Sequence, residues 1–151
     1  MRIPIALATI AIAGCSDGNT SDKSPGEYQL ETARADFRRT IIPSYTFRWR
    51  ESCACPSEIT NTIQIAVSGY TEITDATYAS GGAVPANVRA RLLTIDGVFD
   101  TIQAAFDEGA DEIDVEYNLA YGYPTAVAID YDTQIADEEL SLTISDVLID
   151  P

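Results

Sequence analysis

Hydrophobic periodicity changes along this chain in an order that restricts the folds it can adopt. Apolar residues recur every three to four positions in two segments, 30–41 and 95–106, and at alternate positions in the segments that follow each of them. The first spacing is typical of an amphipathic helix, and the second of a strand with one buried face. The chain therefore predicts the order α-β-β-β-α-β-β-β. We expect an α+β fold in which two main helices cover one face of an antiparallel sheet.

The helical segments differ in how well their ends are marked. Thr94 can cap the second helix and Gly109 is placed to end it. Its apolar stripe comprises Ile95, Val98, Phe99, Ile102, Ala105 and Phe106. The first helix is predicted from Leu30 to the residues before Pro43. Its apolar stripe leaves three basic residues on the outer face, Arg34, Arg38 and Arg39.

The alternating segments predict six strands in two groups. In the first group, Tyr45, Phe47 and Trp49 alternate with polar residues, and segments 59–67 and 70–78 form a hairpin around Ser68-Gly69. Residues 79–87 are predicted to be a loop. In the second group, segments 113–117 and 127–131 flank a Gly122-Tyr123-Pro124 turn, and the last strand runs from about 140 to 149.

The first fifteen residues have the layout of a lipoprotein signal. Arg2 precedes an apolar run that is shorter than the roughly 20 residues needed to span a bilayer. The run ends in Ile12-Ala13-Gly14-Cys15, which resembles the bacterial lipobox, where a peptidase cuts before a cysteine that carries a lipid. We expect residues 1–14 to be a signal peptide and Cys15 to be lipidated, and so to anchor the chain to the bilayer. The alternatives are a released secreted product and a buried N-terminal strand with an unmodified Cys15.

The sequence after Cys15 predicts a tether followed by one domain. Residues 16–26 are small and polar and contain nothing able to form a core, so 15–26 are predicted to be the lipidated cysteine and a flexible tether. Residues 27–151 then form a single domain. The predicted location is the cell envelope. If the cell is Gram-negative, Ser16 favours the outer membrane, facing the periplasm, because an aspartate there tends to retain lipoproteins in the inner membrane.

The charge balance argues against one class of partner. The chain has 24 acidic and nine basic residues, and loss of Arg2 with the signal would change the net charge from −15 to −16. A surface this acidic does not favour binding to nucleic acid through a basic patch, so no nucleic-acid partner is predicted.

Several segments together resemble a known family. The resemblance rests on the aromatic strand running into Cys53-Ala54-Cys55-Pro56, the helix start Thr94–Phe99, Tyr117 before Gly122-Tyr123-Pro124, and Asp137-Glu138-Glu139 before the final strand. In this order they resemble the bacterial envelope family described as domain of unknown function 6174, over about residues 35–148. The family has no established reaction, so the resemblance implies no catalytic residues.

Cys53 and Cys55 are the thiols that remain if Cys15 carries lipid. In an oxidising compartment they should pair with each other or with another chain. Within a regular strand, residues two apart are too far from each other for a disulfide, so an internal pair requires a turn or bulge. Such a pair would be a local clip or a thiol–disulfide exchange site. The clip is favoured because no histidine is present to lower a thiol pKa.

The remaining polar and aromatic residues predict no catalytic site, cofactor or metal. The absence of histidine removes the usual general base, and no nucleophile motif is present. Acidic groups such as Asp130 with Asp132, or Asp137 with Glu138 and Glu139, favour solvated turns over calcium binding. A tyrosine group around one hairpin is a candidate contact surface for a partner, although capping of the sheet edge is the favoured role: Tyr117, Tyr121, Tyr123 and Tyr131. We therefore expect a non-enzymatic domain that binds or holds an unknown envelope protein or glycan. The alternative is a redox protein that uses Cys53 and Cys55.

Overall fold

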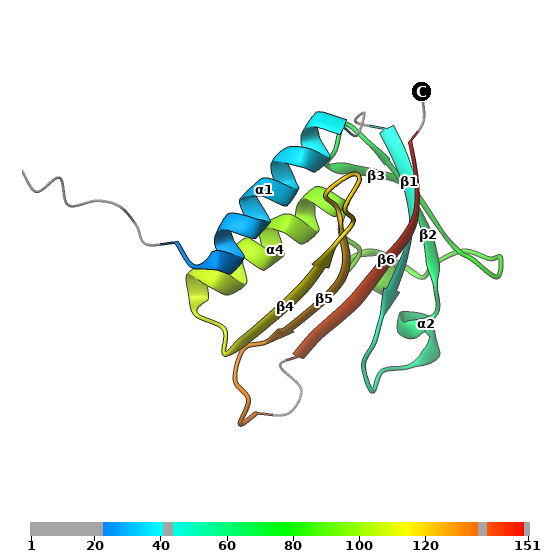
Figure 1. Ribbon diagram of the computed structural model, residues 1–151. Coiled ribbons are helices and arrows are strands. Elements are labelled where there is room, and N and C mark those ends of the chain that lie inside the picture. The colour runs from blue at the N-terminus through cyan, green and yellow to red at the C-terminus, as the bar shows by residue number, and fades with distance from the viewer. Residues whose placement is uncertain (1–22, 41–43, 136–138, 150–151) are drawn as a thin grey trace, which may run out of the picture.

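One sheet of six strands carries two long helices on one face (Figure 1). The computed structural model describes residues 23–40, 44–135 and 139–149 of the 151-residue chain. Its elements are α1 (Pro25–Thr40), β1 (Ser44–Glu51), α2 (Ser57–Thr60), β2 (Ile63–Ser68), β3 (Glu72–Tyr78), α3 (Ala86–Arg89), α4 (Ile95–Glu108), β4 (Glu112–Tyr117), β5 (Pro124–Asp130) and β6 (Glu139–Ile149). This confirms the predicted α+β class, and two short helices, α2 and α3, are added to the predicted order.

The sheet is antiparallel throughout, with the strand order β3-β2-β1-β6-β5-β4. Both halves of the chain have the element order α-β-β-β, but they are not structural repeats. After α1 the chain enters β1 in the middle of the sheet, whereas after α4 it enters β4 at an edge. The pairing of β1 with β6 joins the halves, so the last strand completes the centre of the sheet.

The start of α1 differs from the sequence prediction. The helix begins at Pro25, inside the segment predicted to be tether, because Ser24 and Glu27 form a capping box. The Ser24 backbone N–H donates to the Glu27 carboxylate at 2.7 Å, and the Glu27 N–H donates to the Ser24 hydroxyl at 3.3 Å. Pro25 suits the first helical position because its missing N–H would have no partner there. The predicted signal peptide, Cys15 and tether residues 16–22 lie outside the described residues.

Two predictions in the first half of the sheet are corrected. Ile59 does not extend β2, because Pro56 starts the short helix α2 and its carbonyl accepts hydrogen bonds from the N–H groups of Ile59 and Thr60. The segment after β3 contains α3 in addition to loop. The hairpin of β2 and β3 is confirmed, and its turn places Gly69 and Tyr70 at positive φ.

The core lies between the helices and the inner face of the sheet. Tyr45, Phe47 and Trp49 point inward from β1 and are almost completely buried. Phe37 of α1 contacts Tyr45 and Phe99 of α4, with ring centroids 5.8 Å apart in each pair. The confirmed helix cap at Thr94, whose side chain accepts from the Gly97 N–H, fixes where α4 starts over this core.

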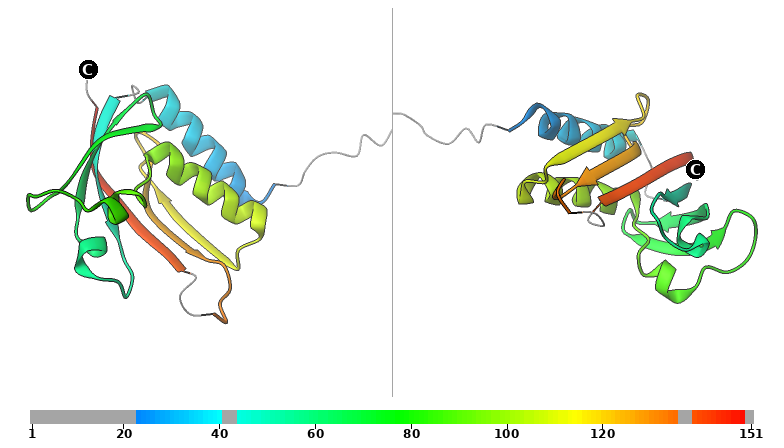
Figure 2. Two further views of the ribbon diagram at one scale, coloured as in Figure 1. Left: turned by 180° about the vertical axis from the view of Figure 1, so that it is seen from behind. Right: turned by 90° about the horizontal axis from the view of Figure 1, so that it is seen from below.

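The opposite face of the sheet is not covered by a helix (Figure 2). Apart from Leu148, its strands present small or polar side chains there, including Arg48, Gln64, Thr143 and Ser145. None of the described helices is long and apolar enough to cross a membrane. Candidate contact surfaces therefore occur on the open face, at the sheet edges and in the turns.

Candidate functional site

A disulfide joins Cys53 and Cys55 immediately after β1 ends. Their Cα atoms are 5.1 Å apart, which is within the usual range for a disulfide. The chain leaves the sheet at Ser52, whose N–H makes a last hydrogen bond to the Ser141 carbonyl of β6 at 2.8 Å. The cysteines thus lie in a bend rather than in the strand, which meets the geometric requirement expected from their spacing.

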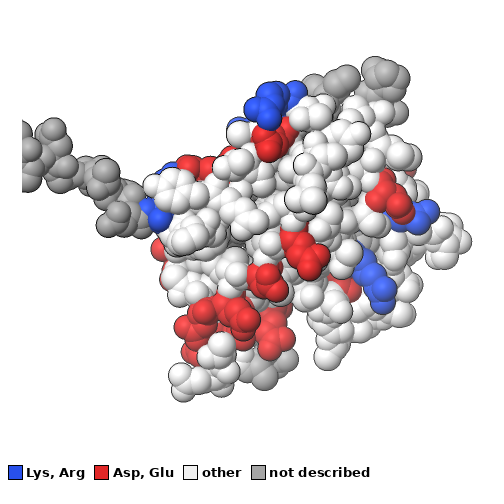
Figure 3. Space-filling view, viewed as in Figure 1, with Lys and Arg blue, Asp and Glu red and all other residues white. Residues whose placement is uncertain are grey.

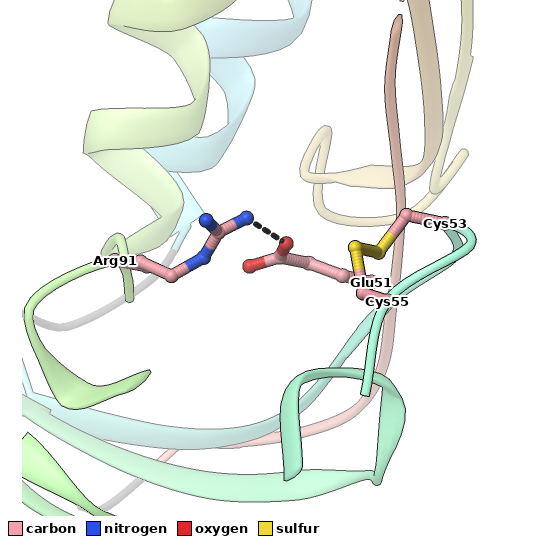
Figure 4. Close-up of a disulfide and its surroundings, with 4 residues drawn as sticks. All are labelled: Glu51, Cys53, Cys55 and Arg91. Carbon is pink, nitrogen blue, oxygen red and sulfur yellow. Dashed lines mark hydrogen bonds and ion pairs between the residues drawn. A yellow bond between two sulfur atoms is a disulfide. The ribbon is translucent and has the colours of Figure 1, made fainter. Parts of the chain in front are cut away.

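The disulfide borders a hollow that also contains a buried carboxylate. The hollow has a volume of about 410 Å³ and lies between the residues after β1, the start of β6 and Arg91. Glu51 is only 6 % exposed, and its carboxylate accepts a hydrogen bond from the Arg91 guanidinium at 2.7 Å (Figure 4). The hydrogen bond and the negative charge of Glu51 raise the pKa of Arg91. The ion pair joins the end of β1 to the loop before α4.

Thiol exchange would need an accessible sulfur and a free cation beside it, and the residues lining this hollow provide the first but not the second. Cys53 is exposed, so an incoming thiol could reach it. A reactive cysteine also needs a nearby cation to stabilise its thiolate. The cation of this hollow, Arg91, already binds Glu51 and is half exposed. The geometry therefore favours a clip that fixes the bend between β1 and α2.

The clip predicts a measurable loss of stability when both cysteines are replaced by alanine. For a loop this short, loss of the cross-link costs about 1–2 kcal/mol in free energy of unfolding through the entropy of the unfolded chain. Urea denaturation of the intact chain carrying Cys15→Ser, with and without Cys53→Ala/Cys55→Ala, measures it. Reductant should destabilise the first protein by the same amount and leave the second unchanged. Equal stability of the two proteins would contradict a stabilising clip.

The four tyrosines of the predicted contact surface lie in different environments. Tyr117 stacks on Phe99 with centroids 6.3 Å apart, and burial raises its pKa to about 12. Tyr123 is buried, and burial raises its pKa as well. Tyr121 is exposed in the β4–β5 turn. Tyr131 follows the other end of β5, where burial and, secondly, Glu108 raise its pKa.

The structure brings only part of this group together. Tyr117, Tyr121 and Tyr123 share the β4–β5 end of the sheet, and Tyr131 lies at the opposite end, about 20 Å away along seven residues of β5. Tyr121 shares its turn with Leu119, which is fully exposed. Contact with a partner through these residues stays a prediction. Leu119 also belongs to this exposed surface, and the sequence analysis missed it because it considered only the tyrosines.

The sequence analysis missed an ion-pair network between the two long helices. Asp96 of α4 is buried and accepts hydrogen bonds from Arg34 and Arg38 of α1 at 2.8–3.2 Å. Arg34 also binds Asp100 and lies over the Phe99 ring. The prediction of an outer-face position is therefore wrong for Arg34, whose side chain is 24 % exposed, whereas Arg38 stays 53 % exposed while it reaches Asp96. Periodicity identified the buried side of α1 but not the direction of α4, toward which both guanidinium groups reach.

Acidic side chains gather at the end of the sheet where β4 begins and β5 ends (Figure 3). Glu112, Asp114, Asp130 and Glu139 surround a hollow of about 360 Å³ there. Asp130 accepts a hydrogen bond from the Asp132 N–H, and Asp132 accepts one from the Gln134 N–H, so both carboxylates stabilise the local turn. Asp137 and Glu138 lie outside the described residues. In the described part of the chain, no three His, Cys, Asp or Glu side chains are arranged to hold a metal ion.

Comparison with known proteins gives one match. A family model described as "Family of unknown function (DUF6174)" matches residues 29–149, which include the cysteine pair, all of α1 after its first four residues, α4 and the whole sheet. This confirms the family resemblance seen in the sequence. No curated protein and no solved structure matches the chain.

Proposed function

We propose that this chain, which belongs to the family of unknown function DUF6174, is the globular domain of a lipid-anchored envelope protein that binds a partner without catalysing a reaction. The observation that carries the proposal is the pairing of Cys53 with Cys55. Disulfides persist in oxidising compartments, which supports export of the chain. Pairing of these two leaves Cys15, at the end of an apolar run, as the third cysteine and the candidate for lipid.

The binding part of the proposal is supported by what the fold leaves uncovered. One face of the sheet, two edge strands and the β4–β5 turn are accessible in the described structure. The disulfide hollow, in contrast, has its arginine neutralised by Glu51. These features suit a surface that holds an envelope protein or glycan more than a site that turns over a substrate.

Intact mass of the protein extracted from membranes tests the anchor. We expect the mass of a chain that starts at Cys15, increased by acyl groups and decreased by the two hydrogen atoms lost on disulfide formation. The matched control is Cys15→Ser, which should leave the membrane fraction and carry no lipid. A wild-type protein that keeps residues 1–14, or that has an unmodified Cys15, would overturn the anchored assignment.

The partner is tested separately with the anchored protein. Crosslinking in intact cells, followed by purification through the domain, should retain a defined envelope protein or glycan. Failure to retain either across crosslinkers and ionic strengths would remove support for a binding role while leaving the anchor in place.

Thiol–disulfide exchange is the second candidate because Cys53 is exposed at a hollow large enough to admit a peptide thiol. Its reduction potential, measured on the intact chain in thiol redox buffers, decides between the roles. Oxidoreductases lie between about −270 and −120 mV, whereas structural disulfides lie below about −300 mV. A potential in the lower range would exclude the exchange role.

A further inference from the structure

Three of the five large apolar side chains that are exposed in the described structure come from two segments. Tyr28, in the first turns of α1, is 57 % exposed, and Tyr121 in the β4–β5 turn is 38 % exposed. Leu119, in the same turn, is fully exposed. Tyr28 and Leu119 line one hollow of about 400 Å³ between α1 and that turn. We call Tyr28, Leu119 and Tyr121 the anchor-side patch.

The β4–β5 turn holds Leu119 outward. The Asn118 side chain accepts hydrogen bonds from the N–H groups of Ala120 and Tyr121, both at 3.0 Å. The Gly122 N–H donates to the Asn118 carbonyl at 2.8 Å, and Gly122 itself is in contact with the backbone of α1. The turn is therefore fixed from both sides. Leu119 cannot fold back onto the core, and its exposure forgoes about 1.5–3 kcal/mol of burial energy.

The location of the patch limits what can cover it. Tyr28 is five residues after Lys23, where the described chain begins, and Lys23 is eight residues after Cys15. Eight residues span at most about 30 Å. A lipid on Cys15 would therefore keep the side of the domain that carries the start of α1 close to the bilayer. Figure 1 shows the chain entering α1 at its blue end, and the β4–β5 turn lies farther along the same helix.

The start of α1 also contacts the end of α4, from which the chain continues into the acidic end of β4, so charge decides which end of β4 faces the bilayer. Although 22 % of the residues are charged, the stretch from Tyr117 to Ile129 contains none. Figure 3 shows mostly uncharged side chains between the start of α1 and the β4–β5 turn. The acidic group lies at the other end of β4, about 20 Å away. Anionic lipids repel that end, which leaves the uncharged turn facing the membrane.

We propose that the anchor-side patch docks on the phospholipid surface to which Cys15 is attached, with Leu119 in the acyl boundary and the two tyrosines at headgroup level. Tyrosine rings favour this interface because one end is apolar and the other polar. The inference rests on the proposed function, since the anchor supplies the local concentration of lipid. It adds a defined orientation, in which the open face of the sheet stays available for a partner.

Quenching by brominated lipid tests this docking. The membrane-extracted protein carrying Leu119→Trp is reconstituted in vesicles of phosphatidylcholine and anionic phosphatidylglycerol, with and without brominated acyl chains. Emission of the new tryptophan should fall at least twofold with bromine. The matched control is Ser80→Trp, in the exposed loop that follows β3, and it should keep its emission. Figure 1 shows that loop reaching away from the start of α1. Trp49 is buried, so the wild-type signal should not change.

Each other outcome overturns the docking. Anchored protein that floats with vesicles but shows equal quenching at positions 119 and 80 excludes docking and leaves the anchor intact. Protein that does not float excludes both the anchor and the docking. A blue shift of the Leu119→Trp emission that depends on protein concentration, without quenching by bromine, would assign the patch to a second copy of the chain.

Discussion

Replacement of Asp96 by asparagine is expected to lower the free energy of unfolding by about 2 kcal/mol. The Asp96 side chain is 7 % exposed and neutralises two guanidinium groups, those of Arg34 and Arg38. Asparagine keeps the shape of the side chain but removes its charge. Its NH2 group would replace one carboxylate oxygen and would face the guanidinium N–H groups, which are also donors. Arg34 keeps its contact with Asp100, but the hydrogen bonds that Arg34 and Arg38 donate to one carboxylate oxygen of Asp96 are lost, and the two that Arg38 donates to the other oxygen lose their charge.

The position of Asp96 in α4 adds to this effect. It is the second residue of the helix, after the Thr94 cap and Ile95. A carboxylate in the first turn interacts favourably with the helix dipole, an effect of about 0.3–1 kcal/mol that asparagine lacks. The same carboxylate thus stabilises the start of α4 and the contact between α1 and α4.

Asp100→Asn is the matched control because it makes the same change one turn later in the same network. The Asp100 side chain is 66 % exposed, so its ion pair with Arg34 should contribute less than about 1 kcal/mol. Urea denaturation at low and high salt separates the two variants. The cost of Asp100→Asn should shrink with salt, and that of Asp96→Asn should persist. Equal, salt-sensitive costs would mean that the network is only a surface feature.

The ion pairs between α1 and α4 show which contacts could not be predicted from the sequence. Thr94, Gly109 and the Ser68-Gly69 turn act through neighbours within a few residues, so their roles were predictable and are confirmed. Arg34 and Asp96 are 62 residues apart, and only the packing of α1 on α4 brings them together. Ser24 is a different case, since its capping box was present in the sequence but lay outside the apolar stripe that was used to find α1.

The candidate site likewise contains one contact between near neighbours in the sequence and one between distant residues. Cys53 and Cys55 are close in the sequence, so their internal pair could be predicted as one of two options, the other being a pair with another chain, and the structure contains the internal pair. Glu51 and Arg91 could not be linked, because their contact depends on where the loop before α4 meets the end of β1. Continuing the alternation of Tyr45, Phe47 and Trp49 by one step would have placed Glu51 on the inward side of β1. A carboxylate in that row was therefore a signal that a cation had to be near.

Gly122→Ala should destabilise the fold by at least about 3 kcal/mol, because two costs add at this position. Gly122 has a φ of +76°, which an alanine adopts only at a cost of about 1–2 kcal/mol. A Cβ there would also lie 2.3 Å from the Ala33 carbonyl oxygen and 3.0 Å from the Phe37 nitrogen. Both atoms belong to the backbone of α1, so the helix or the whole turn must move.

Gly109→Ala measures the cost of the positive φ alone. Gly109 ends α4 at a φ of +74°, nearly the same as that of Gly122, but a Cβ there meets nothing within 4 Å. It should therefore lose only about 1–2 kcal/mol. The excess loss in Gly122→Ala, measured by urea denaturation of both variants, reports the contact between the β4–β5 turn and α1. Equal losses would mean that the turn moves away from α1 freely. The turn could not then hold Leu119 outward, so this comparison of two alanines also tests the rigidity on which membrane docking depends.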